Sequence, residues 1–343
     1  MEAVVTGVLE EREVVGTGGE VHPYQLLEMR LTEGPHARET VIVEHGQFSQ
    51  VNVPPYSVGD RLLLSEQVTG DGEVTYYVVD AVRRDALMLL AVVFAVLTIV
   101  VGKWRGAASL VGLAFSFLVI FFFVLPRITA GGDPIAITIA AAVIIVPVSF
   151  YISHGVNRKT TSAVVGTLIA LVVTGIIARV ATDAAQLTGF SSDEAMFLQA
   201  AAATPYNMRG LLMSSIIIGL LGVLDDVTVS QAAVVNQLRR VSPDMSIGES
   251  FSRAMDVGTD HIASLVNTLV LVYASTSLPL LLLFTSGSAP FAEVVNYEMV
   301  AEEIVRMLVA SIGLILAVPV TTLVAGAMVA GDPAEANAQA HYH

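Results

Sequence analysis

The sequence contains no cysteine and little charge. Without cysteine the chain can form neither a disulfide nor a thiolate metal site. Only 14% of its 343 residues are charged and 54% are hydrophobic, whereas about 25% charged residues is usual for a soluble domain. This composition excludes an ordinary soluble protein and predicts a polytopic membrane protein whose main partner is the lipid bilayer.

Basic residues are also scarce. The chain has 17 Lys and Arg against 31 Asp and Glu, a net charge of -14. A nucleic-acid partner would require a basic surface that neutralises phosphates, so we expect none. No secretory signal peptide opens the chain, because its first residues are neither basic nor followed by an apolar stretch.

Residues 1–82 show the pattern of β structure. Turn signals at 17–19, 34–35, 54–55, 59–60 and 70–72 separate short runs that are rich in valine or alternate apolar and polar residues. The predicted strands are Val4–Leu9, Tyr24–Leu31, Thr40–Val43, Arg61–Leu64 and Val74–Val82. Five short strands predict a small all-β domain, a barrel of the OB or SH3-like kind.

Long apolar segments follow, each close to the 20 or so residues that cross a bilayer as a helix. They are 86–102, 107–125, 135–153, 160–179, 208–238, 257–284 and 303–330. The predicted fold class is therefore an α-helical polytopic membrane protein of about seven transmembrane helices, with the β domain at its N-terminus. The helical bundle is expected at 83–331 and a short tail at 332–343.

The polar stretch 180–207 is predicted to be an extramembrane or re-entrant connection. Ser191 and Glu194 have the spacing of a capping box, which predicts a short helix that ends before Pro205. Pro147, Pro279 and Pro319 fall inside predicted helices, where each is expected to kink the helix.

Basic doublets predict the topology. They follow the first, third and fifth apolar segments, at Lys103/Arg105, Arg158/Lys159 and Arg239/Arg240. Cytoplasmic loops are enriched in Lys and Arg, so the β domain is expected outside the cell and the C-terminus in the cytoplasm. Because no export signal precedes the β domain, we expect that a leading transmembrane helix is missing from this chain.

Asp225 and Asp226 are the strongest candidates for a functional site. A carboxylate in hydrocarbon is costly, so an intramembrane acid usually faces a protein interior, a polar cavity or a partner. On a regular helix Asp226 shares a face with Ser230, while Asp225 shares another with Thr228. The two carboxylates then point in different directions, unless the helix breaks near them, as in many transporters.

The sixth segment carries a polar stripe. Asp256, Asp260, Ser264 and Asn267 follow helical spacing, and His261 lies on an overlapping stripe. We expect this stripe to face the aspartate pair across the two helices, both sets lying toward the cytoplasmic ends. Two simpler explanations remain open: the acids could be caps at the start of the helix, and the amide and hydroxyls could join helices.

These groups suit a hard cation or a proton. Carboxylate, hydroxyl and amide oxygens favour Na⁺, and His261 would favour a proton relay. A divalent transition metal is left open, because a single histidine is weak support. The chain lacks His-Glu-x-x-His, P-loop, Gly-x-Ser-x-Gly and Gly-x-Gly-Asp signatures. We therefore expect neither an enzyme nor a cofactor.

The stretches 222–231 and 253–271, together with 73–80, 153–160 and 191–199, resemble the YibE/F family of bacterial membrane proteins. The resemblance covers nearly the whole chain. It implies a multi-pass protein of the bacterial plasma membrane with an extracytoplasmic N-terminal domain, commonly preceded by one more hydrophobic helix. It implies no particular activity.

Two main hypotheses follow. The first is an ion- or proton-coupled transporter or permease component whose site is formed by the nine polar residues named above. The second is a non-transporting scaffold whose β domain docks an extracytoplasmic protein. A second copy of the chain or another membrane protein is an expected partner in either case. An intramembrane enzyme is a third, weaker hypothesis.

Overall fold

The computed structural model of the protein describes residues 1–15, 21–33, 36–46, 55–68, 74–202, 205–287 and 290–329. Contacts divide the chain into two compact units, Met1–Leu97 and Thr98–His343. The first unit includes the beginning of the first apolar helix as well as the β strands. The domain boundaries predicted after residues 82 and 331 therefore stay predictions.

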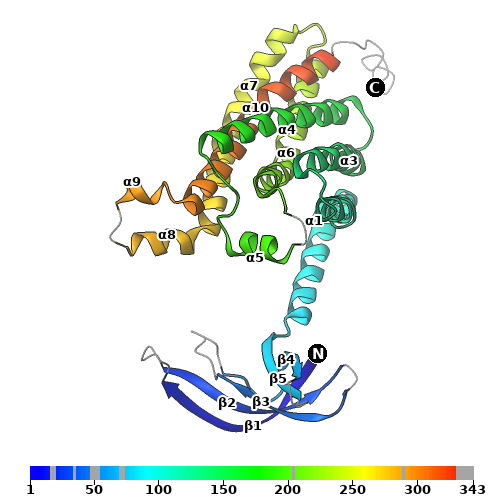
Figure 1. The fold of residues 1–343 in the computed structure, drawn as a ribbon. Coiled ribbons are helices and arrows are strands. Elements are labelled where there is room, and N and C mark those ends of the chain that lie inside the picture. Colours follow the sequence, from blue (N-terminus) through cyan, green and yellow to red (C-terminus); the bar gives the residue numbers. More distant parts are fainter. Residues whose placement is uncertain are drawn as a thin grey trace. The chain divides into compact units, whose positions relative to one another are not determined.

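The first unit contains a five-stranded antiparallel sheet in the order β3-β2-β1-β4-β5 (Figure 1). Its strands are β1 Glu2–Val15, β2 Val21–Leu31, β3 Thr40–His45, β4 Arg61–Val68 and β5 Val74–Ala81. All five predicted strands are confirmed, and most are longer than predicted. The turn at Gly59 is described, with a φ of 102°, whereas the turn signals 17–19, 34–35, 54 and 70–72 lie outside the described residues.

Alternation along the strands creates the core of this unit. Successive strand residues point to opposite faces, and Leu27, Met29 and Leu31 are buried while Arg30 is exposed. The same cluster takes in Leu62 from β4, and its other buried members are Ala3, Val5, Val43 and Leu64. The alternating pattern of the sequence therefore corresponds to one buried face of the sheet.

A buried histidine closes one end of this core. The His45 ring lies 4.7 Å from the Tyr56 ring, centroid to centroid. Gln25 fixes the backbone of Tyr56 by donating to its carbonyl at 3.1 Å and accepting from its N–H at 2.8 Å. Burial lowers the pKa of His45 below its ordinary value of 6.5.

This burial predicts an acid-sensitive β unit. As pH falls below about 6.5, the unfolded chain protonates His45 while the folded chain does not, so stability is lost. We expect the temperature of the thermal transition of the β unit to decrease as the pH is lowered from 7.5 to 5.5, and to decrease less in His45→Gln. Hydrogen exchange of the β2 and β3 amides in the full chain, followed with temperature at each pH, measures this transition. His36→Gln, at a half-exposed site, is the control; equal pH dependence in both variants would contradict the prediction.

The rest of the chain is helical. The elements are α1 Arg84–Val119, the π-helical turn η1 Ile120–Val124, α2 Leu125–Thr129, α3 Pro134–His154, α4 Arg158–Ala184, α5 Asp193–Ala201, α6 Met208–Val241, α7 Ile247–Thr276, α8 Leu278–Thr285, α9 Phe291–Val294 and α10 Glu298–Val329. Among the described residues, six helices are long and apolar enough to cross a membrane. They are Arg84–Thr129, Pro134–His154, Arg158–Ala184, Met208–Val241, Ile247–Thr276 and Glu298–Met328. A multi-pass helical membrane protein is therefore confirmed, whereas the count of about seven is not.

The first two predicted segments lie within the span Arg84–Thr129, which has 46 residues. Its regular geometry is interrupted at Lys103, where φ is 52° and ψ is -134°. The interruption brings Gly106 so close to Thr98 that a Cβ built on the glycine would lie 2.0 Å from the Thr98 carbonyl oxygen. The chain therefore bends sharply at this point.

The bend requires glycine at position 106. Because the clashing atom belongs to the backbone, Gly106→Ala forces the bend to open, and we expect a loss of about 2 kcal/mol or more in the free energy of unfolding. Gly102→Ala is a matched control, since no atom lies within 4 Å of its built Cβ. Thermal unfolding in detergent compares the two. Equal stability of both variants would show that the bend is not as tight as described.

Helices α4, α6 and α10 pack together at the centre of the second unit, with α3 and α7 beside them (Figure 1). Close approach depends on glycine: a Cβ on Gly166 of α4 would lie 2.4 Å from the Thr321 hydroxyl of α10, and one on Gly313 would lie 2.3 Å from the Thr174 hydroxyl. Leu220 and Leu224 of α6 and Leu314 of α10 are completely buried between these helices. The site residues on α6 are thus held by a closely packed support.

Several local predictions need correction. The helix α7 begins at Ile247, ten residues before the predicted segment, because Ser246 caps it by accepting from the N–H of Glu249 at 3.1 Å. Pro279 does not lie in a helix interior but in the first turn of α8, where a proline is accommodated without a kink. Pro147 and Pro319 are inside α3 and α10, as predicted.

The short helix in the connection 180–207 is confirmed as α5. Its cap is Ser192, which accepts from the N–H of Ala195 at 3.2 Å, rather than the predicted Ser191. The hydroxyl of Ser191 instead donates to the carboxylate of Glu302 at the start of α10. Ser191 therefore binds a carboxylate that is distant in sequence instead of capping α5.

Candidate functional site

Asp225 and Asp226 lie near the midpoint of α6, which is one uninterrupted helix from Met208 to Val241. The predicted alternative of a helix broken at the aspartates is wrong. Their predicted position toward a helix end is also wrong, because α6 continues for 15 residues beyond Asp226, or about 22 Å. The pair therefore lies far from either end of this candidate membrane span.

Asp225 is half-buried, and its Oδ1 atom is buried without a hydrogen-bond partner among the described residues. It lies on the α6 face toward α3. The two helices run in the same direction: a Cβ on Gly210 would lie 3.2 Å from Pro134, and Leu221 packs on the cluster that holds Ile145. Continuing this register places Asp225 level with Ser149.

Ser149 was not predicted from the sequence. Its hydroxyl lies 3.4 Å from the hydroxyl of Ser116 on α1 and 3.5 Å from the carbonyl oxygen of Gly112. Hydroxyls from two helices therefore stand at the level of the half-buried Asp225 carboxylate. Single serines in apolar helices carry no periodic signal, and their proximity appears only when α1, α3 and α6 are packed.

Asp226 is exposed on a different side of α6. It shares this side with other exposed small or polar residues at helical spacing. We call this set the α6 open face: Ser215, Gly219, Gly222, Asp226 and Ser230. The predicted divergence of the two carboxylates follows from the regular helix, and Asp226 and Ser230 do share a face.

Thr228 is fully buried and takes part in helix packing. Its hydroxyl lies 2.8 Å from that of Thr167 on α4 and donates to the carbonyl of Leu224 at 2.8 Å. These contacts occupy the hydroxyl group. Thr228 therefore joins α6 to α4, and nothing in its position brings it to the carboxylates.

The predicted stripe on α7 is mostly exposed. Asp256, Asp260, Ser264 and Asn267 are all exposed, and His261 is half-buried. Because α7 begins at Ile247, Asp256 and Asp260 are its tenth and fourteenth residues, beyond its first two turns, and the interpretation of these acids as caps at the helix start is wrong. Ser264 and Asn267 contact no neighbouring helix of the described chain by a side-chain hydrogen bond.

Helices α6 and α7 are neighbours that run in opposite directions. Gln231 contacts Ala254, and a Cβ on Gly219 would lie 3.3 Å from the Tyr273 hydroxyl. Asp226 lies between these contacts, so it is near the level of His261. Within the described residues no hydrogen bond or ion pair joins Asp225 or Asp226 to the α7 set.

Gln231 is a buried polar residue that the sequence analysis did not select. It is 1% exposed, and its Nε2 donates to the Thr322 hydroxyl at 2.8 Å and to the Ala254 carbonyl at 2.9 Å. Gly258 leaves room for this amide, since a Cβ there would lie 3.2 Å from Nε2. The side chain links α6, α7 and α10 five residues after Asp226.

A second missed group lies at the end of the bundle where α10 begins. Arg306 donates to the Ser215 hydroxyl of the α6 open face at 2.6 Å and pairs with Glu302 at 2.8 Å. Glu298 accepts from the Thr188 hydroxyl at 2.7 Å and from the N–H of Gly189 at 3.1 Å. Charged residues of α10 therefore tie the connection before α5 to the bundle and reach the first residue of the open face.

Metal coordination receives no support from this geometry. Across the part of the chain that the structure describes, no three His, Asp or Glu side chains are grouped so that they could hold a metal ion. The exposed α7 acids and the α6 pair do not form one cluster.

Comparison with known proteins identifies the family. The family model described as YibE/F-like protein matches residues 90–331, which is most of the chain. No curated protein and no solved structure matches it. The match covers the helices that carry both aspartates and the α7 stripe, in agreement with the resemblance seen in the sequence. The chain belongs to the YibE/F-like family of proteins.

Proposed function

We propose that the protein is a non-enzymatic, ion- or proton-coupled transporter or permease component, with an intramembrane acidic site on α6. One observation carries this proposal: Asp225, at the midpoint of a membrane-spanning helix, has a buried carboxylate oxygen without a hydrogen-bond partner among the described residues. A purely structural acid at this depth would be paired, because an unpaired one destabilises the fold by several kcal/mol. A bound cation or proton removes this penalty.

Asp226 and the α7 stripe extend the proposed site. The α6 open face and the stripe of Asp256, Asp260, Ser264 and Asn267 are polar surfaces on two neighbouring membrane helices. Hydrocarbon solvates such surfaces poorly, so water or a second protein must cover them. In our proposal Asp226 and Ser230 bind a cation such as Na⁺ or pass a proton to His261, which lies at their level.

The membrane arrangement is part of the proposal. A straight helix of 46 residues would extend about 69 Å, more than twice the hydrocarbon thickness of about 30 Å. Together with the bend at Lys103, this length favours two crossings in Arg84–Thr129 and seven in all. Trp104 at the bend is 84% exposed, as suits a membrane interface.

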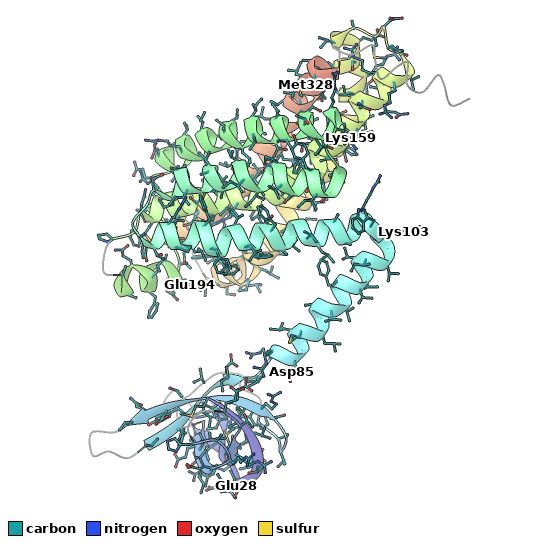
Figure 2. All side chains as sticks on the ribbon, turned by 90° about the vertical axis from the view of Figure 1, so that its right-hand side faces the viewer. Glu28, Asp85, Lys103, Lys159, Glu194 and Met328 are labelled. Carbon is teal, nitrogen blue, oxygen red and sulfur yellow. The ribbon has the colours of Figure 1, made fainter. Side chains whose placement is uncertain are left out.

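The proposed orientation follows the basic residues. Lys103, Lys159 and Met328 lie toward one end of the helical unit, and Glu194 lies toward the other (Figure 2). We assign the lysine end to the cytoplasm of a bacterial plasma membrane, which leaves the C-terminus inside and the N-terminal domain outside. The edge strands β3 and β5 contact each other, and we propose that this contact closes the sheet into a small barrel of the OB type.

A liposome assay tests the transport proposal. The purified protein is reconstituted, and uptake of Na⁺ and H⁺ is followed under an imposed gradient beside protein-free liposomes. We expect uptake of one of the two ions above the protein-free level. The transport proposal would be contradicted if folded protein took up neither ion faster than protein-free liposomes do.

A second candidate function is that of a scaffold. Apolar side chains are exposed on the β unit, among them Val21 at 58%, Ile42 at 62% and Val79 at 64%. Such residues favour docking of an extracytoplasmic protein. Deletion of residues 1–82 would then abolish function, whereas substitution of the aspartates would change little. Co-purification of a partner in fixed ratio supports this function; full activity without the β domain argues against it.

A further inference from the structure

Three hydroxyl groups are buried without partners near the beginning of α3 and α6. Thr138 is 1% exposed, Ser214 is 3% exposed and Thr182 of α4 is 0% exposed. None of the three hydroxyl oxygens has a hydrogen-bond partner among the described residues. A buried hydroxyl that lacks a partner destabilises a fold, so three such groups call for a common explanation.

Thr138 and Ser214 face each other across α3 and α6. Both helices begin at this end, where a Cβ on Gly210 would lie 3.2 Å from Pro134. Thr138 lies one turn after Pro134, and Ser214 lies one turn after Gly210. Residues four apart share a helix face, and the two helices run in the same direction, so their hydroxyls stand at the same level.

Thr182 of α4 lies at the same level as Thr138 and Ser214. The cluster at this end of the bundle combines Ala178 of α4 with Leu212 and Ile216 of α6, and Ile135 of α3 packs against it. Thr182 lies one turn after Ala178 on the same helix face. Three helices that pack on one another thus each contribute one unpartnered hydroxyl to this layer.

We propose that Thr138, Thr182 and Ser214 together bind an ordered water molecule. Buried waters typically make about three hydrogen bonds to otherwise unsatisfied polar groups, which is what three neutral hydroxyls offer. No carboxylate is part of the set, so a desolvated cation would lack the charge that balances its own. Ser214 also shares the α6 face of Ile218, Leu221 and Asp225, so this water would lie on the same side of α6 as Asp225, three turns nearer the start of the helix.

The sign of a stability change tests the proposal. In the purified full chain, Ser214→Ala and Thr138→Val each remove one hydroxyl with little change of shape. If the three groups share a water, each substitution leaves that water short of a partner, and we expect the Tm to fall by about 2 to 4 °C for each hydrogen bond of about 1 kcal/mol. The double variant should lose less than the sum of the two, because the second substitution acts on a site already disrupted.

The opposite result would overturn the proposal. If the hydroxyls are dry and unpaired, both single substitutions raise the Tm and their effects add. Thr167→Val, which removes a bonded hydroxyl, must lower the Tm, while Thr259→Val on the exposed side of α7 should leave it unchanged. Equal Tm shifts in sodium and choline buffers are expected; a shift only in sodium would assign the site to a cation instead.

Discussion

Asp225→Asn is expected to abolish ion-coupled uptake while the protein remains folded. Loss of a charge that binds the ion removes several kcal/mol of interaction in a low-dielectric site, and each 1.4 kcal/mol corresponds to about a tenfold change. We therefore expect uptake to fall by more than about tenfold. The amide keeps the shape of the side chain, and it removes a buried charge that has no partner among the described residues. The Tm should consequently stay the same or rise.

The control for this experiment is Asp244→Asn. Asp244 is exposed in the turn between α6 and α7, outside the membrane spans, so its substitution makes the same chemical change without effect on the site. Asp226→Asn and the double variant complete the set. Transport at the wild-type rate in both single variants and in the double variant would reject the acidic site and favour the scaffold.

Gly313→Ala and Gly166→Ala are expected to cause large losses of stability. A Cβ at Gly313 would lie 2.3 Å from the Thr174 hydroxyl and 2.7 Å from Leu220, both of which are completely buried. A Cβ at Gly166 would lie 3.0 Å from the Cα of Thr321, which is backbone and cannot rotate away. Overpacking of this kind destabilises by about 1 to 3 kcal/mol, occasionally more. Helices α4, α6 and α10 would have to separate.

Gly222→Ala is the matched control for these two variants. It lies on the α6 open face, and no atom is within 4 Å of its built Cβ. Alanine favours the helix over glycine by about 1 kcal/mol, so this variant should gain stability. Thermal unfolding in detergent, with tryptophan fluorescence from Trp104 and circular dichroism, compares the three. If Gly313→Ala and Gly166→Ala were as stable as Gly222→Ala, the three central helices would be less closely packed than the structure shows.

Local patterns predicted the elements well. Valine-rich alternation located all five strands, since a strand that buries one face must alternate. Hydrophobic length located the membrane helices, because any helix that crosses a bilayer needs about 20 apolar residues. The start of α7 was missed for the same reason: Ile247 to Asp256 is polar enough to leave the apolar segment, although Ser246 is a good cap.

The candidate site was only partly predictable. Helical spacing placed Asp225 and Asp226 on different faces, and the continuous α6 agrees. Spacing cannot show what a face contacts, which is why the α7 stripe was expected to meet the aspartates although the structure leaves it exposed. Gln231, Ser149 and Arg306 escaped notice because their partners are distant in sequence and appear only when the helices pack.

The central claim, that the aspartate pair binds a cation or a proton, is tested most directly by thermal stability. The detergent-purified protein is unfolded across Na⁺, K⁺, pH and a panel of divalent metals, with Asp225→Asn and Asp226→Asn beside the wild type. A ligand that binds only the folded state raises stability by mass action, by about 2.7 kcal/mol at 100 times its Kd. We predict a rise in Tm specific to one ion or to protons that is lost in at least one variant. Identical responses of the wild type and both variants under every condition would contradict the account.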